Sequence, residues 1–366
     1  MRKLFPSLLA LVLAVQACAR DRSPIDVATA GPWSELYGEM NRRGIDLAIA
    51  EINAGGGVRG RPIRLVARDD KADGGTAAAI ANEFLSNRSI VAVVGHVTSG
   101  AMVAAARVYD RGLPAVSTTA SSPDLSGISP WVFRVIPSDS ANGYSIARFA
   151  NERGWRRAAI LYENTAYGRG LTESFRRAFD GDVVAMDPIP SEGSSDFEPY
   201  VSYLATRAPD MVFVAGTNAS GRAAILEARR QRLSAPLIGG DGWSSIVADT
   251  AVAEGVFVAT PFTSQDPRPA AQRFVQAFRA RYQMDPDGNA ALGYDATMLI
   301  ARAISEAGAS RPAIRRWLSS LGEADAFAGV TGPIRFHQSG DVVGKSVVIT
   351  RARAGALVVE TGGTGS

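Results

Sequence analysis

The sequence has few of the residues that most catalytic and metal sites need. It contains one cysteine and two histidines in 366 residues, and His96 and His337 do not lie at a metal-ligand spacing. It has no GxSxG motif and no phosphate-binding loop of the pattern GxxxxGKS or GxxxxGKT. Residues 55–60 match GxGxxG, but they follow a predicted helix and precede a predicted strand, whereas a dinucleotide-binding motif follows a strand. We therefore expect no metal, no cofactor and no enzymatic activity.

A strong excess of one charge is also absent. The formal net charge is +3, and the arginines are dispersed along the chain, which does not favour a nucleic-acid partner. A single cysteine excludes a disulfide within the chain. The composition, 46% hydrophobic and 20% charged, is typical of a globular protein. Because 366 residues exceed what one hydrophobic core usually serves, we expect two lobes.

The first 17 residues have the features of a signal peptide. Arg2 and Lys3 are followed by an apolar stretch over residues 4–15, which is too short to span a bilayer comfortably, and then by small residues. Cys18 stands where bacterial lipoproteins carry the cysteine that is lipidated after cleavage, and residues 18–24 would form a tether. The alternative is an ordinary cleavage site beside a cysteine that is buried or present by chance.

Strands and helices are predicted to alternate along most of the mature chain. Residues 90–94 form an apolar, β-branched run typical of a buried strand, and Met102, Val103 and Ala106 recur after it at helical spacing. The whole series covers residues 25–29, 40–53, 63–68, 75–86, 90–94, 100–111, 115–118, 131–135, 140–153, 158–162, 170–179, 183–188, 197–206, 211–215, 221–231 and 237–239. This alternation predicts an α/β protein with two parallel sheets and right-handed crossovers.

The last third of the chain is less regular. Helices are predicted over 268–282, 290–307 and 311–321, and strands over 342–350 and 356–360. Residues 361–366 are rich in glycine and predict a frayed tail.

Polar residues follow several of the predicted strands, where open parallel sheets bind their ligands. They are Ser99, Thr119, Ser121, Tyr167, Thr217 and Asp241. Thr98 or Ser99 would begin a helix whose free N–H groups can hold a carboxylate or a phosphate. An α-amino acid, with a carboxylate and an ammonium, would fit hydroxyls on one lobe and Asp241 on the other. Taken singly, each serine or threonine could be only a helix cap and Asp241 only a turn residue.

Several segments together resemble the bacterial leucine/isoleucine/valine-binding protein family, the type I periplasmic receptors of ABC importers. The segments are GPWSELYGEM, INAGGGVRGRPIRLVARDD, VVGHVTSG, GLPAVSTTASSPDL, FRVIPSD, AILYENTAYGRGL and GYDATMLIARAI. The similarity extends from about residue 25 to residue 350.

The resemblance implies two doubly wound α/β lobes joined by three crossover segments, near residues 137, 262 and 332, with the ligand held between them. The N-terminal lobe would comprise residues 25–137 and 263–332, and the C-terminal lobe residues 138–262 and 333–360.

The resemblance also implies roles for the polar residues. Ser99 and the Thr119 backbone would bind the ligand carboxylate, and Ser121 would contact both carboxylate and ammonium. Tyr167 would cover the ligand. Asp241 stands where the family usually has a glutamate that pairs with the ammonium.

The side-chain pocket is where the sequence departs from the family. Tyr37 would lie near that pocket and Trp33 would narrow it, whereas Thr217 replaces a pocket tyrosine. The implied protein is a monomeric, lipid-anchored receptor in the periplasm or cell envelope that closes over an amino acid, branched-chain or related, and delivers it to an ABC permease. The alternatives are a periplasmic sensor of the same fold for an amide, an aromatic acid or another metabolite, and an enzyme.

Overall fold

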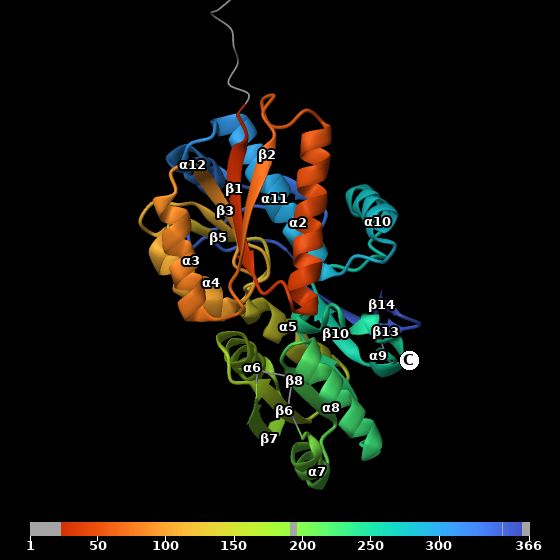
Figure 1. The fold of residues 1–366 in the computed structure, drawn as a ribbon. Helices are drawn as coiled ribbons and strands as arrows, with labels where there is room; N and C mark the ends of the chain where they lie inside the picture. The colour runs from red at the N-terminus through yellow and green to blue at the C-terminus, as the bar shows by residue number, and fades with distance from the viewer. Residues whose placement is uncertain (1–22, 191–195, 346, 361–366) are drawn as a thin grey trace, which may run out of the picture.

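Short runs of apolar residues form the strands of two separate sheets, and amphipathic helices cover both faces of each. The computed structural model describes residues 23–190, 196–345 and 347–360. Figure 1 shows the two resulting lobes one above the other, with the N-terminal strand in the upper lobe. The predicted signal peptide, Cys18 and the tail lie outside the described residues. Along the described chain, no helix is both long enough and apolar enough to cross a bilayer.

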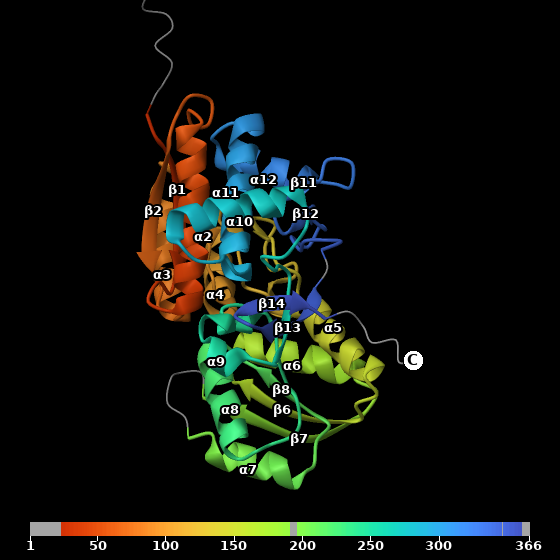
Figure 2. The same cartoon turned by 90° about the vertical axis from the view of Figure 1, so that its right-hand side faces the viewer.

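The sheet of the first lobe has five parallel strands in the order β2-β1-β3-β4-β5. They are β1 (Ile25–Gly31), β2 (Ile63–Asp69), β3 (Ile90–Gly95), β4 (Ala115–Ser117) and β5 (Val132–Arg134). One face packs against α2 (Leu36–Ala54), α11 (Gly288–Ala307) and α12 (Arg311–Ser320). The other face packs against α3 (Gly74–Ser86) and α4 (Ser99–Tyr109). Figure 2 shows α10 (Pro269–Tyr282) beside α2 and α11, against which its phenylalanines pack.

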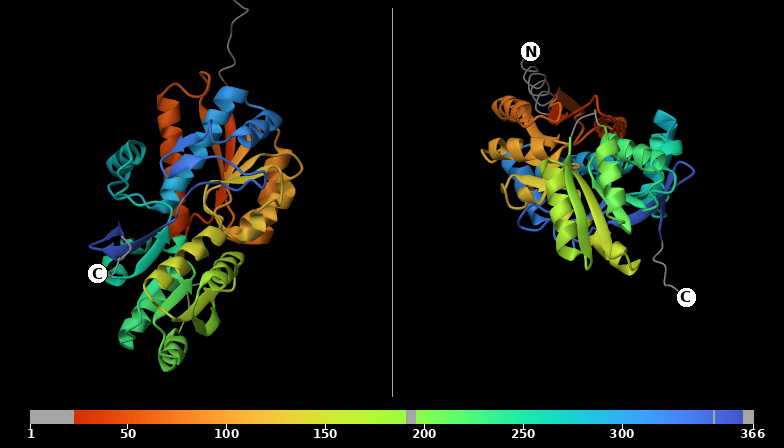
Figure 3. Two further views of the ribbon diagram at one scale, coloured as in Figure 1. Left: turned by 180° about the vertical axis from the view of Figure 1, so that it is seen from behind. Right: turned by 90° about the horizontal axis from the view of Figure 1, so that it is seen from below.

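The sheet of the second lobe has seven strands in the order β14-β13-β10-β9-β8-β6-β7. They are β6 (Arg157–Glu163), β7 (Asp182–Ile189), β8 (Met211–Ala215), β9 (Leu237–Gly239), β10 (Phe257–Thr260), β13 (Val348–Arg353) and β14 (Ala356–Val359). The last two strands are antiparallel additions to a parallel sheet. One face packs against α5 (Asp139–Glu152) and α6 (Ala166–Ala178), and the other against α7 (Glu198–Thr206), α8 (Asn218–Arg230) and α9 (Thr250–Ala253). Figure 3, from below, shows these strands between helices.

The two lobes repeat one topology. The order β7-β6-β8-β9-β10 in the second sheet corresponds, strand for strand in chain order, to β2-β1-β3-β4-β5 in the first. In such a sheet the order reverses between the first and third strands, and ligands bind beyond the carboxyl ends of the strands at that point. The switch points are therefore the β1/β3 junction in the first lobe and the β6/β8 junction in the second.

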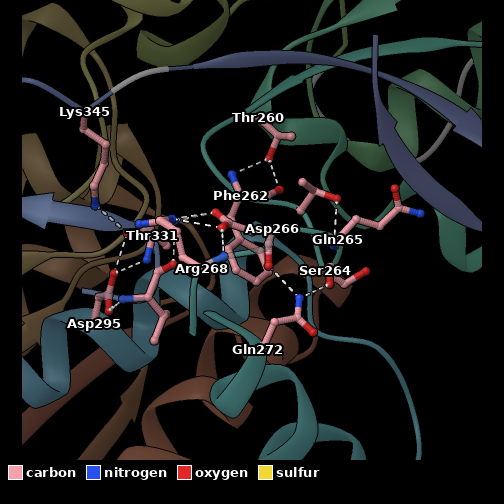
Figure 4. Close-up of polar contacts among 12 residues, drawn as sticks. Thr260, Phe262, Ser264, Gln265, Asp266, Arg268, Gln272, Asp295, Thr331 and Lys345 are labelled. Atoms are coloured by element: carbon pink, nitrogen blue, oxygen red, sulfur yellow. Dashed lines mark hydrogen bonds and ion pairs between the residues drawn. The ribbon is translucent and has the colours of Figure 1, made fainter. Parts of the chain in front are cut away.

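The chain crosses between the sheets three times, after β5, after β10 and before β13, so the predicted fold class is confirmed. The rear view in Figure 3 shows the last crossing as the blue segment that runs from the upper lobe to the lower one. Buried polar contacts tie the crossings together (Figure 4). The Lys345 ammonium donates to the Val135 carbonyl at 2.7 Å and to the Thr331 hydroxyl at 2.5 Å. Thr331 and Asp295 are hydrogen-bonded in turn.

Arg268, in the second crossing, also joins this network. Its guanidinium contacts Asp266 and donates to the Val330 carbonyl at 2.9 Å. The carboxylate of Asp295 receives the Val330 N–H at 2.7 Å. All three crossings therefore meet at one cluster of hydrogen bonds, buried around Lys345 and partly buried around Arg268.

The structure differs from the sequence predictions mainly near the C-terminus. The strand predicted over 342–350 begins only at Val348, and Val342 instead forms an isolated bridge with Phe336. β10 and the short hairpin of β11 (Phe327–Gly329) and β12 (Gly332–Ile334) were not predicted. Asp341 bridges Arg134 of β5, so the chain stays beside the first sheet beyond residue 332. The lobe boundaries remain a prediction, and these contacts favour a third crossing nearer Lys345.

Candidate ligand-binding cleft

A cavity of about 520 Å³ lies between the lobes, at the carboxyl ends of the parallel strands. α4 and α6 meet across the lobe boundary at this level (Figure 1). Six of the eight residues predicted to bind the ligand line the cavity: Tyr37, Ser99 and Thr119 from the first lobe, and Tyr167, Thr217 and Asp241 from the second. The topology brings them together because both sheets point the carboxyl ends of their strands toward the boundary.

Ser99 is the first residue of α4 and is 3% exposed. Its hydroxyl oxygen accepts the backbone N–H groups of Ser121 and Ser122 at 3.2 and 3.1 Å, so it does not act as a helix cap. The Ser99 hydroxyl hydrogen is therefore still available as a donor. The N–H groups of the first helical turn are unpaired within the helix and carry partial positive charge. This end of the cavity therefore offers hydrogen-bond donors of the kind that favour an anionic group.

Thr119 follows β4 on the same wall. Its hydroxyl donates to the Val97 carbonyl at 2.8 Å, which fixes the loop beside Ser99. The backbone N–H of Thr119 has no acceptor among the described residues. The backbone N–H of Thr119, rather than its hydroxyl, is thus the group that could donate to a ligand.

Asp241 lies opposite, at the start of the short helix η3 (Asp241–Trp243). Its Oδ1 accepts the Asn142 amide at 2.5 Å and the Tyr167 hydroxyl at 3.1 Å, and that hydroxyl accepts the Gly242 N–H at 3.0 Å. Both side-chain bonds fall on Oδ1, which leaves Oδ2 as an acceptor for a cation. Burial raises the pKa of Asp241 to about 6, against the effect of the Tyr167 and Asn142 hydrogen bonds.

A second carboxyl group, Asp139, lies in the first turn of α5 next to this site. It is fully buried, and both its oxygens lack a hydrogen-bond partner among the described residues. Burial, followed by the nearby Asp241 carboxylate, raises the pKa of Asp139 well above its usual range. Two carboxyl groups close together disfavour double ionisation. Burial and the neighbouring Asp241 carboxylate therefore both disfavour ionisation of Asp139.

Glu163 also lines the cavity and was missed by the sequence analysis. It is the last residue of β6 and only 2% exposed, and its Oε1 accepts the Thr217 N–H, the Thr217 hydroxyl and the Ser220 hydroxyl at 2.8–2.9 Å. Burial raises the pKa of Glu163, while these donors oppose the shift. Thr217 precedes α8, but its hydroxyl donates to Glu163 and does not cap the helix. Glu163 directly follows the strand predicted over residues 158–162, so the search for polar residues after strands could have found it.

Trp33 and Ser121 are not among the residues that line the cavity. The Trp33 indole N–H donates to the Arg68 carbonyl at 2.7 Å, and the Arg42 guanidinium lies 5.5 Å from the ring centroid, so the ring is held against the first lobe. Ser121 sits behind Ser99, where its N–H bonds the Ser99 hydroxyl and its carbonyl accepts Arg134 at 2.8 Å. It therefore supports Ser99 and does not face the cavity.

His96 is fully buried outside the cavity lining. Its two ring nitrogens lie 2.7 Å from the Asp70 carboxylate and 2.9 Å from the Tyr109 hydroxyl. Within the described residues, no group of three or more histidine, cysteine, aspartate or glutamate side chains could hold a metal ion. The cleft instead offers hydrogen-bond donors and carboxylates of a kind that suits a small charged organic molecule.

A family model described as periplasmic binding protein matches residues 27–356. The chain belongs to this family. A relative in Pseudomonas aeruginosa, the leucine-, isoleucine-, valine-, threonine-, and alanine-binding protein, is 31% identical over 331 residues, covering 87% of each chain. The match to the periplasmic binding protein family includes both lobes and every cavity residue named above.

Solved structures of similar proteins share the fold. The branched-chain amino acid transporter substrate-binding protein LivJ from Streptococcus pneumoniae, in complex with isoleucine, is 27% identical with a TM-score of 0.85, covering 92% of this chain and 99% of that one. An ABC transporter substrate-binding protein from Desulfitobacterium hafniense, in complex with leucine, is 33% identical with a TM-score of 0.80, covering 92% and 100%. The likeness spans nearly the whole of each relative.

Proposed function

We propose that this periplasmic binding protein is the receptor of an ABC importer and binds an α-amino acid between its lobes. The observation that carries the proposal is the pairing of opposite walls. Ser99 and the start of α4 offer donors to a carboxylate from one lobe, while Asp241 offers a carboxylate to an ammonium from the other. The relatives named for leucine, isoleucine and valine support it.

Hinge closure follows from this arrangement. A ligand that contacts Ser99 and Asp241 at once stabilises the closed state, since only that state brings both walls within hydrogen-bond distance of it. The apparent affinity for the ligand then depends on the fraction of the empty protein that is closed. The buried cluster around Lys345 lies at the crossings between the lobes, where the hinge would be. The lobes would comprise residues 25–137 with 263–332, and 138–262 with 333–360, the last boundary shifted toward Lys345.

We also propose a location and a partner for the protein. The signal peptide would direct export, and lipidation of Cys18 would hold a monomeric receptor at a membrane of the periplasm or cell envelope. The receptor would deliver its ligand to a membrane permease. Mass spectrometry of the membrane fraction should find an acylated N-terminal Cys18, and an unmodified N-terminus there would contradict the anchor.

A thermal-shift screen tests the binding function. The ligands are the α-amino acids, a set of small carboxylates without an ammonium, such as benzoate, and a set of amides. A ligand present at 100 times its dissociation constant stabilises the native state by about 2.7 kcal/mol, which raises the Tm of a chain of this size by roughly 3–4 °C. At least one α-amino acid should do so. A response only to ligands lacking an ammonium would contradict the role of Asp241 and favour a sensor of other metabolites.

A further inference from the structure

The second lobe places a buried carboxylate at the switch point of its sheet. Glu163 ends β6 and Thr217 follows β8, and these two strands are neighbours, so both residues lie where the strand order reverses and ligands bind. Three donors reach Oε1 of Glu163, but none of the described residues donates to Oε2. Glu163 therefore places a carboxyl group in the cavity wall, and its Oε2 can still accept a hydrogen bond.

The apolar residues that line the cavity are the two tyrosines Tyr37 and Tyr167, Val97, and the alanines Ala72 and Ala219. Val97 is the only aliphatic residue larger than alanine among the lining residues that the structure describes. Three carboxylates line it, those of Glu35, Glu163 and Asp241, against one ammonium, that of Lys71. An aliphatic ligand group placed over Glu163 would exclude water from the carboxylate without replacing its hydrogen bonds, which is unfavourable.

The spacing of the strands sets the length of a ligand that reaches both carboxylates. Glu163 and Asp241 come from β6 and β9, which are separated by β8. Adjacent strands lie about 4.8 Å apart, so the ends of β6 and β9 are roughly 10 Å apart. With an α-ammonium on Asp241, a side chain must extend across the end of β8 to reach Glu163. Long side chains with a terminal N–H group can span this distance, whereas those of valine and threonine are too short.

We propose that the ligand is an α-amino acid whose long side chain ends in an N–H donor, and that Glu163 receives this donor. The proposal rests on amino-acid binding as proposed above and narrows the class to amide, ammonium or guanidinium side chains. Glu163 is a specificity-determining residue, because a charged acceptor that is desolvated in the complex favours a ligand with a donor over one of equal length without it.

Calorimetric titration of the wild-type protein at pH 7.5 tests the class. Glutamine, lysine and arginine are compared with methionine and leucine. Glutamate is included as the counterpart of glutamine, because its side chain has the same length but ends in a carboxylate, as Glu163 does. At least one donor-bearing amino acid should bind tenfold or more tightly than methionine and leucine, and glutamate should bind more weakly than glutamine. If leucine, isoleucine, valine or methionine binds as tightly as the best donor-bearing amino acid, this inference is wrong while amino-acid binding stands. If no α-amino acid binds, the proposed function fails and the inference fails with it.

Glu163→Gln tests the residue itself, since it removes the charge and keeps the shape. The preference for the best donor-bearing amino acid over methionine should fall at least tenfold, with methionine affinity changed less than threefold. Glu173→Gln is the matched control, because Glu173 lies on α6, which follows β6, and its half-exposed side chain pairs, among the described residues, with Arg176 and Arg177. An equal loss for both ligands in Glu163→Gln would indicate a structural role and overturn the assignment. If Glu163→Gln does not fold, the titrations of the wild-type protein still test the proposed class of ligand.

Discussion

Replacing Asp241 with asparagine should weaken ligand binding and, at the same time, stabilise the empty protein. The asparagine Oδ1 can keep the hydrogen bonds from Asn142 and Tyr167, so the change removes charge and little else. A ligand ammonium would lose a charge-assisted hydrogen bond of about 1.5–3 kcal/mol. The expected loss of affinity is therefore about 10- to 150-fold.

The gain in stability follows from the raised pKa. Burial raises the pKa of Asp241 from 3.8 to about 6, so the folded state holds the proton more tightly than the unfolded state does. The folded state accordingly loses stability as the pH rises from 3.8 through 6, and at pH 7.5 the charged group costs about 3 kcal/mol. Asparagine carries no such cost. With an unfolding entropy of about 2.1 cal/mol/K per residue, the Tm of this chain should rise by about 4 °C.

Thermal unfolding and calorimetric titration measure the two effects. The gain in Tm should be largest near pH 7.5 and should shrink at pH 5, where wild-type Asp241 is itself largely protonated. Asp325→Asn is the control, because Asp325 is exposed and remote from the cleft in sequence and contacts. If the Asp241→Asn protein melts no higher than wild type and binds the ligand with an affinity within threefold of wild type, Asp241 is neither a buried charge nor the partner of the ligand ammonium.

Three further results are expected. Below pH 6 the affinity of the wild-type protein for its amino acid should fall about tenfold per pH unit as Asp241 takes up a proton, and a flat titration profile from pH 8 to pH 4.5 would contradict this. Gly44→Ala should lower the free energy of unfolding by about 2 kcal/mol or more, since the added methyl group would lie 1.9 Å from the Ala290 carbonyl oxygen. Urea denaturation measures this free energy, and a decrease below about 0.5 kcal/mol would contradict the prediction. Lys345→Met should cost about 1–3 kcal/mol by leaving the Val135 carbonyl without its donor, and equal urea midpoints would argue against a structural cluster at the crossings.

The fold could be predicted from the sequence because local patterns agree with the global topology. Residues 90–94 form an apolar β-branched run, and β3 spans Ile90–Gly95 in the structure; the helices likewise follow their apolar periodicity. The hairpin of β11 and β12 was not predicted because each strand has three residues, too few to show an alternation of apolar and polar side chains. The start of β13 was misplaced because its pairing with β10 is set by a contact far along the chain.

The candidate site was predictable where backbone topology decides it. Ser99 and Asp241 line the cavity because each follows a parallel strand, and the strands end at one boundary. Trp33 could not be placed this way, since the acceptor of its indole N–H is 35 residues away in the sequence. Glu163 directly follows the strand predicted over residues 158–162, but only the structure shows that its Oε2 is left without a donor from the described residues.

A crystal structure of the protein with its tightest-binding amino acid would show both ends of the ligand at once. The ligand should lie between the lobes, with its carboxylate within hydrogen-bond distance of Ser99 and the Thr119 backbone N–H. Its ammonium should contact Asp241. A ligand bound in the reverse orientation, or bound away from the start of α4, would rule out the proposed binding mode.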